Sequence, residues 1–273
     1  MVRDEPRRQE VYRLRLSYIL RFLVAMLLGE KRDLGPDIKG TLRSVRPRPR
    51  VIGDQNIPAE GPFAFVANHY ERPGLKVFWG GMLAANAIFE RRKAHRALHW
   101  LMTSEWYNFR LAGIIPVPVW FLRWLFRRIA HVYSLIIVPR SPQRAVGRAA
   151  AMRSIMEVVE QGEPIGLFPE GVGEEVLIEA MPGTGLFLHS LNKRGIPILA
   201  AGIYEEDGAL IVRFGPPFSI ELPEGAAKED RDRLAREQLM AHIGRLLPRH
   251  MWGPYTSAIE DLLARSGHIP YQI

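Results

Sequence analysis

Cysteine is absent from the 273 residues of the chain. Disulfide scaffolds, thiolate metal sites and cysteine nucleophiles are therefore excluded. No apolar run reaches the length of about 18 residues that a membrane-spanning helix requires. The first ten residues are highly charged, and no small-residue cleavage site follows the first apolar segment. Both features argue against a cleaved signal peptide.

Several common catalytic motifs are also missing. The chain has no Gly-x-Ser-x-Gly elbow, no Walker loop, no Gly-x-Gly-x-x-Gly after a strand and no His-Glu-x-x-His. These absences argue against serine hydrolases with a nucleophile elbow, nucleotide-binding enzymes of the two common types and zinc peptidases. His95 and His99 are four residues apart, but no third ligand accompanies them, so we predict no metal site.

Acidic residues are scarce in two stretches of the chain. The formal net charge is +8, from 37 basic and 29 acidic side chains. Residues 1–50 hold 13 basic against 6 acidic side chains, and residues 91–148 hold 11 against the single acid Glu105. Residues 149–223 reverse the balance, with 4 basic and 11 acidic. A local basic excess suits an anionic partner such as lipid headgroups, a phosphorylated ligand or nucleic acid.

Two segments combine apolar residues with arginines in the pattern of amphipathic helices. In residues 11–28, leucines occupy one helical face, and Arg13 and Arg21 occupy another. Residues 114–138 are apolar and aromatic, yet they contain three arginines and His131. Such side chains have an apolar body and a polar end, which suits a membrane interface. Packing of these helices on their own domain is the alternative, and the sequence leaves both open.

The segment that follows the first helix has a different composition. Residues 35–50 contain three prolines among several basic residues. Prolines interrupt helices and favour turns, so we expect an irregular linker here.

From about residue 51 the sequence alternates between apolar strands and helices. Residues 63–67 form the continuous apolar run of a strand that is buried on both faces. Residues 135–138, a helix beginning at Ser141 and ending before Gly162, and residues 165–168 form a compact β-α-β unit. The two strands of such a unit are parallel.

The remaining predicted elements follow from the same periodicities. They are helices over 75–89, 184–193, 226–247 and 255–265, and strands over 197–204 and 210–214 joined by a turn at 205–208. The pattern predicts an α/β fold: a single domain with a mixed, mostly parallel sheet flanked by helices, plus an N-terminal amphipathic helix and a C-terminal helical tail. The expected boundaries are an arm and linker over 1–48, the α/β domain over 49–223 and the tail over 224–273.

Polar loops follow two of the predicted strands. One loop runs from Asn68 through His69 to Gly74, and the other runs from Pro169 through Glu170 and Gly171. Because ligands bind beyond the carboxyl ends of parallel strands, we expect His69 and Glu170 at the same edge of the sheet. Histidine is the usual general base near neutral pH, and glycine lets the backbone approach a ligand closely.

These residues resemble the motifs of the glycerolipid acyltransferases, the PlsC-like family of 1-acylglycerol-3-phosphate acyltransferases. The family's first motif begins with Asn-His, as at Asn68-His69, and its second ends in arginine, as residues 135–140 end at Arg140. Its third is Phe-Pro-Glu-Gly, which stands here at residues 168–171, and its fourth is an apolar strand like residues 195–199. The likeness spans roughly residues 50–220.

The resemblance implies an enzyme that transfers a fatty acyl group from a thioester carrier to a hydroxyl of a lipid acceptor. The carrier is acyl-CoA or an acyl carrier protein, used as a co-substrate, and no cofactor is expected. His69 would be the general base. Arg140, Glu170 and Gly171 would hold an acceptor that is lysophosphatidate-like or a glycolipid.

The chain departs from the family pattern at two places. The family places an aspartate five residues after the histidine to orient the imidazole, and Gly74 stands there in this chain. Glu71 is the nearest substitute, and Glu105 is the second candidate. After Phe-Pro-Glu-Gly the family usually has Thr-Arg-Ser, whose arginine helps to bind the acceptor's phosphate, whereas this chain has Val-Gly-Glu-Glu. A phosphate would then be bound through Arg140, with Arg72 as a further candidate.

Two alternatives stand beside the acyltransferase. Gly74 is compatible with a catalytically weak or inactive relative of the family that binds lipid or acyl-CoA. A nucleic-acid-binding protein is disfavoured, because the basic residues lie among bulky aliphatic ones and no nucleic-acid motif occurs. We expect the protein in the cytoplasm, peripheral on the inner face of an anionic membrane, with the acyl donor and the lipid acceptor as its partners.

Overall fold

The computed structural model describes residues 12, 14, 16–31, 34–92, 98–103, 110–111, 115–138 and 145–266. The helices within these ranges are α1 (Leu16–Leu28), α2 (Leu34–Leu42), α3 (Phe78–Arg91), α4 (Val119–Tyr133), α5 (Ala145–Glu160), α6 (Thr184–Asn192), α7 (Lys228–Gly244) and α8 (Thr256–Ser266). The strands are β1 (Arg50–Ile52), β2 (Ala64–Ala67), β3 (His99–Met102), β4 (Arg110–Leu111), β5 (Ile115–Pro116), β6 (Ile136–Ile137), β7 (Ile165–Leu167), β8 (Ile198–Glu206) and β9 (Ala209–Phe214).

Seven strands form one sheet in the order β1-β9-β8-β2-β7-β3-β6. Every neighbouring pair is parallel except β8 and β9. These two form the hairpin predicted at 205–208, and its turn residues Asp207 and Gly208 have φ values of 51° and 73°. Positive φ at both positions is what a type I′ turn needs. The predicted α/β fold with a mixed, mostly parallel sheet is confirmed.

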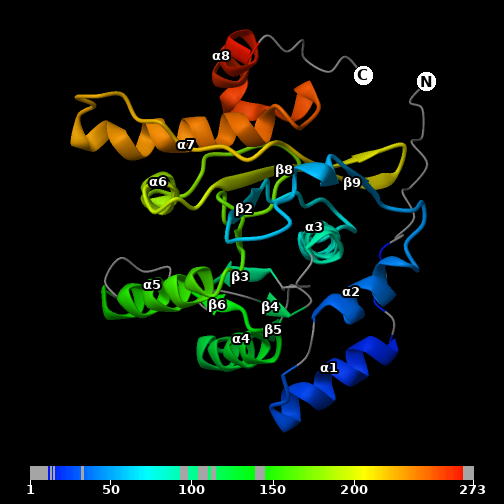
Figure 1. Cartoon of the computed structure of the whole chain (residues 1–273). Helices are drawn as coiled ribbons and strands as arrows, with labels where there is room; N and C mark the ends of the chain where they lie inside the picture. The colour runs from blue at the N-terminus through cyan, green and yellow to red at the C-terminus, as the bar shows by residue number, and fades with distance from the viewer. Residues whose placement is uncertain are drawn as a thin grey trace.

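Helices cover both sides of the long strands β8 and β9, with α3 on one side and α7 on the other (Figure 1). Two consecutive residues of β8 show why α3 and α7 can pack closely on the sheet. Gly202 meets the backbone of Leu246, just after α7, whereas Ile203 faces Gly80 of α3. A Cβ at Gly80 would lie 2.6 Å from Ile203 and one at Gly202 would lie 2.8 Å from the Leu246 carbonyl oxygen. Glycine at both positions therefore allows this close approach.

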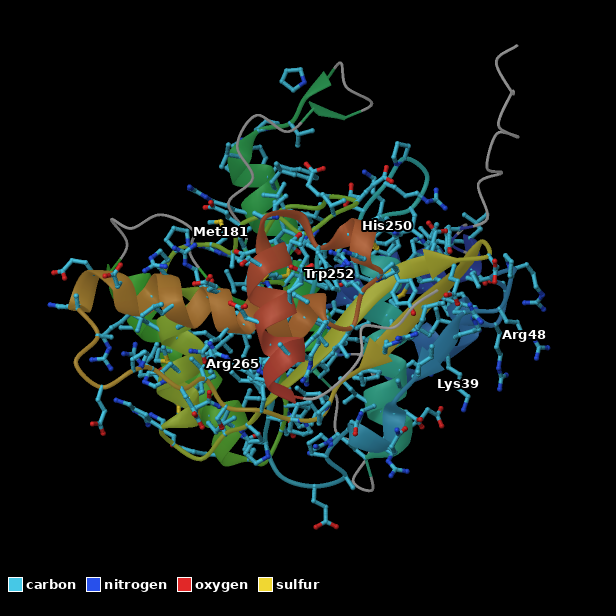
Figure 2. All side chains as sticks on the ribbon, turned by 90° about the horizontal axis from the view of Figure 1, so that it is seen from above. Lys39, Arg48, Met181, His250, Trp252 and Arg265 are labelled. Atoms are coloured by element: carbon cyan, nitrogen blue, oxygen red, sulfur yellow. The ribbon has the colours of Figure 1, made fainter. Side chains whose placement is uncertain are left out.

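The C-terminal helices contribute to the same core as the sheet. Leu239 and Ile243 of α7 and Ile259 of α8 are fully buried in the main hydrophobic cluster. Trp252, labelled in Figure 2, lies buried between these helices and donates its Nε1–H to the Leu247 carbonyl oxygen at 3.1 Å. The sheet and the helices after it are thus held by one apolar interior.

The expected linker over 35–50 is wrong in its first half, because α2 occupies residues 34–42. Pro36 lies in the first helical turn, where no intrahelical N–H is lost. Ile38 and Leu42 of this helix are buried in the main cluster. Burial of an apolar face therefore outweighs the local signal of the proline.

The two predicted amphipathic segments form α1 and α4. No helix in the described part of the chain combines the length and the apolar character needed to cross a membrane.

Candidate functional site

The two polar loops lie side by side, because the strands before them are neighbours. β2 and β7 are parallel, with Val66 opposite Leu167. Their carboxyl ends therefore reach the same edge of the sheet. The loops are joined directly: the backbone N–H of His69 donates to Glu170 Oε2 at 2.5 Å. Tyr70 and Glu174 then form a short parallel bridge between the two loops.

Glu170 is buried and connects these two loops through hydrogen bonds. Its side chain is only 2% exposed, and its second oxygen accepts the backbone N–H of Ile178 at 2.9 Å. Burial raises the pKa of Glu170 to about 7, against the opposing effect of the two N–H donors. The carboxyl group thus connects the backbone that carries His69 to the loop that follows β7.

His69 is poised to stay neutral. Burial lowers the pKa of its imidazole, and the nearby charge of Glu71 only partly offsets this effect. The ring packs edge-on against Phe168, with 5.1 Å between the ring centres, and Phe168 in turn stacks on Trp100. Among the described residues, the buried Nδ1 of His69 has no hydrogen-bond partner. A neutral imidazole is the form that accepts a proton.

Gly173 holds open the space between His69 and Glu71. A Cβ at this position would lie 2.8 Å from His69 Nδ1, 2.5 Å from Glu71 Cβ and 3.0 Å from Glu71 Oε2. The imidazole nitrogen and the carboxylate therefore border the same small volume. The other oxygen of Glu71 accepts a hydrogen bond from Lys76.

Asn68 anchors the start of the histidine loop. It is 3% exposed, and its amide makes two bonds to the backbone of Ile203 in β8, donating to the carbonyl oxygen at 2.8 Å and accepting the N–H at 2.7 Å. These bonds extend the pairing of β2 with β8 by one residue beyond the strand. In the sequence, Asn68 was notable only as the first residue of the Asn-His pair.

Arg72 is engaged by Glu205, a residue that the sequence analysis missed. Arg72 donates to both oxygens of Glu205, with Nη2 at 2.6 Å from Oε1, and its Nη1 donates to the Pro73 carbonyl oxygen. Tyr70 and Tyr12 donate their hydroxyls to the same carboxylate, each at 3.2 Å. We call these four residues the Glu205 cluster. Any phosphate bound at this place would have to compete with Glu205 for Arg72.

The other predicted site residues fall into two groups. Gly171 lies in the loop after β7 with φ +65°, and a Cβ there would lie 3.2 Å from Met181. Glu105 and Arg140 lie outside the described residues. Within the described part of the chain, no group of three or more His, Asp or Glu side chains is arranged to hold a metal ion. The structure thus brings together His69, Glu71, Glu170 and Gly171, and directs Arg72 to Glu205.

Comparison with known proteins finds similarity to solved structures. No family model matches the chain, and no curated protein matches it. The chain is similar to the crystal structure of the 1-acyl-sn-glycerophosphate (LPA) acyltransferase PlsC from Thermotoga maritima. The two share 17% sequence identity with a TM-score of 0.43, over 91% of this chain and 90% of that one. That protein is an acyltransferase of the class that the sequence motifs resemble.

Proposed function

We propose that the protein is an O-acyltransferase that moves a fatty acyl group from acyl-CoA or an acyl carrier protein to a hydroxyl of a lipid acceptor at a membrane surface. The observation that carries this proposal is the placement of His69. A histidine with a lowered pKa lies at the carboxyl edge of a parallel sheet, and the carboxylate of Glu170 holds its backbone at 2.5 Å. This is the arrangement that a general base for hydroxyl activation needs.

In the proposed reaction, a ring nitrogen of His69 accepts the proton of the acceptor's hydroxyl. The hydroxyl oxygen forms a bond to the acyl carbonyl carbon, and the carbon–sulfur bond of the thioester then breaks. The imidazolium returns its proton to the departing thiolate. Atoms and charge balance without a metal or an added cofactor.

We propose Glu71 as the carboxylate that replaces the family aspartate. It borders the same volume beside Gly173 as His69 Nδ1, and its charge raises the pKa of His69. An Nδ1–H bond to this carboxylate would orient the ring and leave Nε2 as the base. Glu105 remains the second candidate.

The loop after β7 bears on the acceptor. Gly173 stands where the family usually carries an arginine, and the exposed Glu174 and Glu175 follow it. Arg72 is engaged by Glu205. Carboxylates near a phosphate are repulsive, so we propose a lysophosphatidate-like acceptor only if Arg140 supplies the cation, and otherwise a glycolipid. In both cases Glu170 and Gly171 shape this side of the site.

The test is release of CoA from palmitoyl-CoA in the presence of liposomes and a panel of lyso-lipid and glycolipid acceptors. A thiol-reactive dye detects CoA without background, because the protein contains no cysteine. We expect acceptor-dependent release, reduced about 100-fold or more in His69→Ala. The matched control is His250→Ala, which replaces an exposed histidine in the segment between α7 and α8 (Figure 2).

A catalytically inactive relative that binds lipid or acyl-CoA is the second candidate, favoured by Gly74 at the aspartate position. It predicts no release with acyl-CoA or acyl carrier protein, and acyl-CoA binding that is unchanged in His69→Ala. That pair of results would replace the enzyme proposal with the binding one.

A further inference from the structure

The side chains of the histidine loop, residues 68–74, alternate between two environments. Tyr70 pairs with Glu174 in a short parallel bridge. In this bridge the N–H of Glu71 donates to the Glu174 carbonyl oxygen at 3.2 Å, and the N–H of Glu174 donates to the His69 carbonyl oxygen at 3.1 Å. The segment is therefore extended, and successive side chains point to opposite sides. His69 and Glu71 share one side. Tyr70 and Arg72 share the other.

The first side faces Gly173. A Cβ at Gly173 would lie 2.8 Å from His69 Nδ1 and 3.0 Å from Glu71 Oε2. Lys76 donates to the other oxygen of Glu71, but its side chain is 63% exposed, and exposed ion pairs contribute little. The backbone of the loop is therefore the main determinant of where the Glu71 carboxylate lies.

The second side is closed by Glu205. Arg72 donates to both oxygens of this carboxylate, and the Tyr70 hydroxyl donates to Oε2 at 3.2 Å. The side chains of Arg72 and Glu205 are only 10% and 7% exposed. Burial raises the pKa of Tyr70, and the charge of Glu205 raises it further, so the hydroxyl stays protonated and remains a donor. Hydrogen bonds to a buried charge hold their partners firmly.

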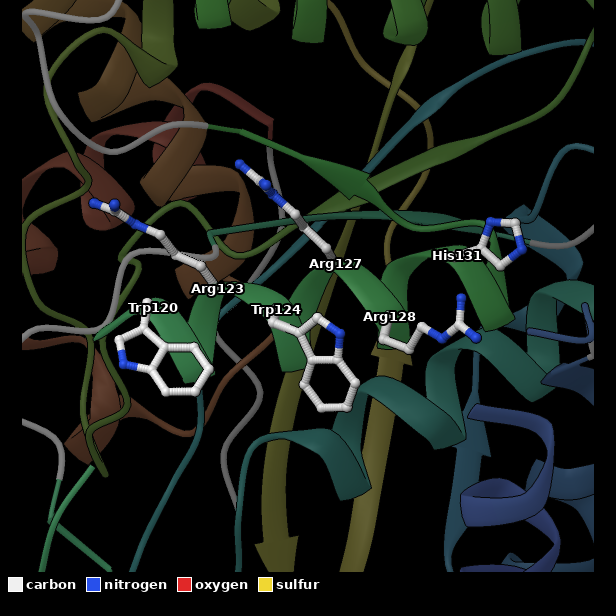
Figure 3. A pocket seen from close by; sticks show the side chains of 6 residues that line it. All are labelled: Trp120, Arg123, Trp124, Arg127, Arg128 and His131. Carbon is white, nitrogen blue, oxygen red and sulfur yellow. The ribbon is translucent and has the colours of Figure 1, made fainter. Parts of the chain in front are cut away.

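Arg72 differs from the arginines of α4. Arg123 and Arg127 project together from that helix (Figure 3). They line an open hollow of about 530 Å³, whose lining residues are Trp120, Arg123, Trp124, Arg127, Arg128 and His131. The guanidinium of Arg72 is instead enclosed between Glu205 and the Pro73 carbonyl oxygen, to which it donates at 2.7 Å. Its contacts are thus with the protein's own chain.

The end of the loop is a tight turn. The N–H of Leu75 donates to the Arg72 carbonyl oxygen at 2.9 Å, and Pro73 is followed by Gly74 with φ +83°. This is the pattern of a type II turn. Apart from its chain neighbours, the described residue that a Cβ at Gly74 would approach within 4 Å is Arg72, with Nη1 at 3.5 Å. A side chain at the family's aspartate position would therefore lie beside Arg72 and not beside His69.

We propose that Glu205 is a positioning residue that holds the Glu71 carboxylate beside His69. It acts through Tyr70 and Arg72, because these two alternate with the catalytic pair along the same extended backbone. The loop cannot rotate without breaking buried bonds to a charge, so Glu71 keeps its side. The inference rests on the proposed function and deepens it, and it assigns Arg72 to the loop rather than to the acceptor.

Tyr70→Phe tests the proposal without changing any charge. The ring is kept and the bond to Glu205 is lost. We expect Glu71 to lose its alignment, so that its charge raises the pKa of His69 less and that pKa falls. NMR titration of the imidazole C–H signals measures the change. The His69 signal is identified by its absence in His69→Ala.

A double-mutant cycle shows whether the effect passes through Glu71. Glu71→Gln alone should also lower the pKa of His69, and adding Tyr70→Phe to it should lower that pKa no further. A merely structural role of Tyr70 would not depend on Glu71 in this way. Tyr12→Phe is the matched control, because it removes a hydroxyl bond to Glu205 at the same 3.2 Å from outside the loop. It should leave the pKa of His69 unchanged.

Kinetics provide a second measurement. In the acyl-transfer assay we expect kcat to fall about tenfold in Tyr70→Phe, the order expected for one hydrogen bond to a charged group, with little change in KM for the acceptor. Arg72→Lys keeps the charge but loses the planar fork that reaches both oxygens of Glu205. It should give the same pattern.

Three results would overturn the proposal. One is an unchanged pKa of His69 in Tyr70→Phe. Another is an equal fall in Tyr12→Phe, which would make the cause general to Glu205 and not specific to the loop. The third is a rise in acceptor KM with unchanged kcat in Arg72→Lys, which would assign Arg72 to the acceptor.

The NMR titration needs no turnover, so it separates this proposal from the enzyme proposal. The expected pKa changes without CoA release from any donor would refute the enzyme and support the positioning of Glu71 by Glu205. Acceptor-dependent release with no pKa change in Tyr70→Phe would support the enzyme and refute the positioning.

Discussion

Glu170 shows how one side chain sets the position of another. Its carboxyl is buried, yet both oxygens face backbone N–H groups, from His69 and Ile178. Loss of either bond would leave a buried donor without an acceptor, at a cost of about 1–3 kcal/mol. We therefore expect Glu170 to position His69 through the backbone, whereas the family resemblance gives it a contact with the acceptor.

Glu170→Gln separates these two roles. The amide keeps the volume but turns an N–H toward one of the two backbone donors. If Glu170 positions His69, kcat falls and KM for the acceptor changes little, and the free energy of unfolding in urea drops by about 1–3 kcal/mol. A rise in KM with unchanged kcat would instead assign Glu170 to acceptor binding. Glu224→Gln, at an exposed position, serves as the control.

Glu71→Gln tests the orienting carboxylate through the pH profile. The negative charge of Glu71 raises the pKa of His69, so its removal lowers that pKa further. The acid limb of kcat/KM, which lies below the ordinary histidine value of 6.5, should move to lower pH. Loss of the ring's partner should also reduce kcat by about tenfold or more. An unshifted acid limb would remove Glu71 from the site and favour Glu105.

His242 gives a stability prediction with a defined sign. Burial, assisted by the charge of Arg245, lowers its pKa to about 3, and the ring stacks on Phe218 at 3.7 Å. Between pH about 3 and 6.5 the unfolded chain binds a proton there that the folded protein does not. The free energy of unfolding then rises with pH across this window, by at most about 1.4 kcal/mol per pH unit from this group.

His242→Phe should flatten that part of the stability curve, because the stacked ring is kept and the titrating group is removed. Urea unfolding at several pH values measures the slope. His250→Phe, at an exposed position, is the matched control. An equal slope in the wild type and in His242→Phe would contradict the assignment.

Among the elements, the Glu205 cluster joins three parts of the chain. Glu205 lies near the end of β8, Tyr70 and Arg72 belong to the loop after β2, and Tyr12 precedes α1. Tyr12 also packs on Trp79 of α3, with 5.4 Å between ring centres. One buried carboxylate therefore fixes both the histidine loop and the start of the N-terminal arm.

Glu205→Gln should be costly, since Arg72 would be left without its counter-charge at a side-chain exposure of 10%. We expect a loss of roughly 3–5 kcal/mol in the free energy of unfolding, measured in urea. Glu206→Gln is the matched control, because the side chain of its partner Arg50 is 47% exposed. A loss below that of Glu206→Gln would show that Glu205 is not the anchor of the loop.

The sequence correctly predicted the strands and turns that are determined by their own local residues. The buried run at 63–67 became β2, and the β8–β9 hairpin formed where the turn residues stood. Helix α2 was missed because Pro36 within it and the two prolines after it suggested a linker and outweighed its apolar face. Strand β3 was missed because His99 and Trp100 give a half-buried strand no clear alternation. Pairing of His69 with Glu170 followed from the parallel sheet. Pairing of Arg72 with Glu205 did not, because 133 residues separate them and no local pattern links them.

At the scale of the whole molecule, the two edge strands of the large sheet are short. β1 and β6, the outermost strands, have three and two residues. Pro47 and Pro49 precede β1, and Arg46, Arg48 and Arg50 give this edge positive charge. Short edge strands, and at β1 also the charge and the prolines, offer a neighbouring chain little open backbone to pair with.

The solubility of the purified protein follows from the contrast between short sheet edges and the exposed apolar side chains of α1 and α4, Leu16, Leu27 and Trp120 among them. Self-association at high concentration should run through side-chain contacts of α1 and α4, so a mild non-ionic detergent should return the particles to monomer size in light scattering. Leu20→Ser with Leu27→Ser should have the same effect without detergent, whereas Leu186→Ser, at an exposed position on α6, should not. Detergent-resistant aggregates that bind thioflavin T would point to the strands instead. We thus expect the exposed apolar side chains of α1 and α4 to limit the solubility of the purified protein, and molecules that cover them to increase it.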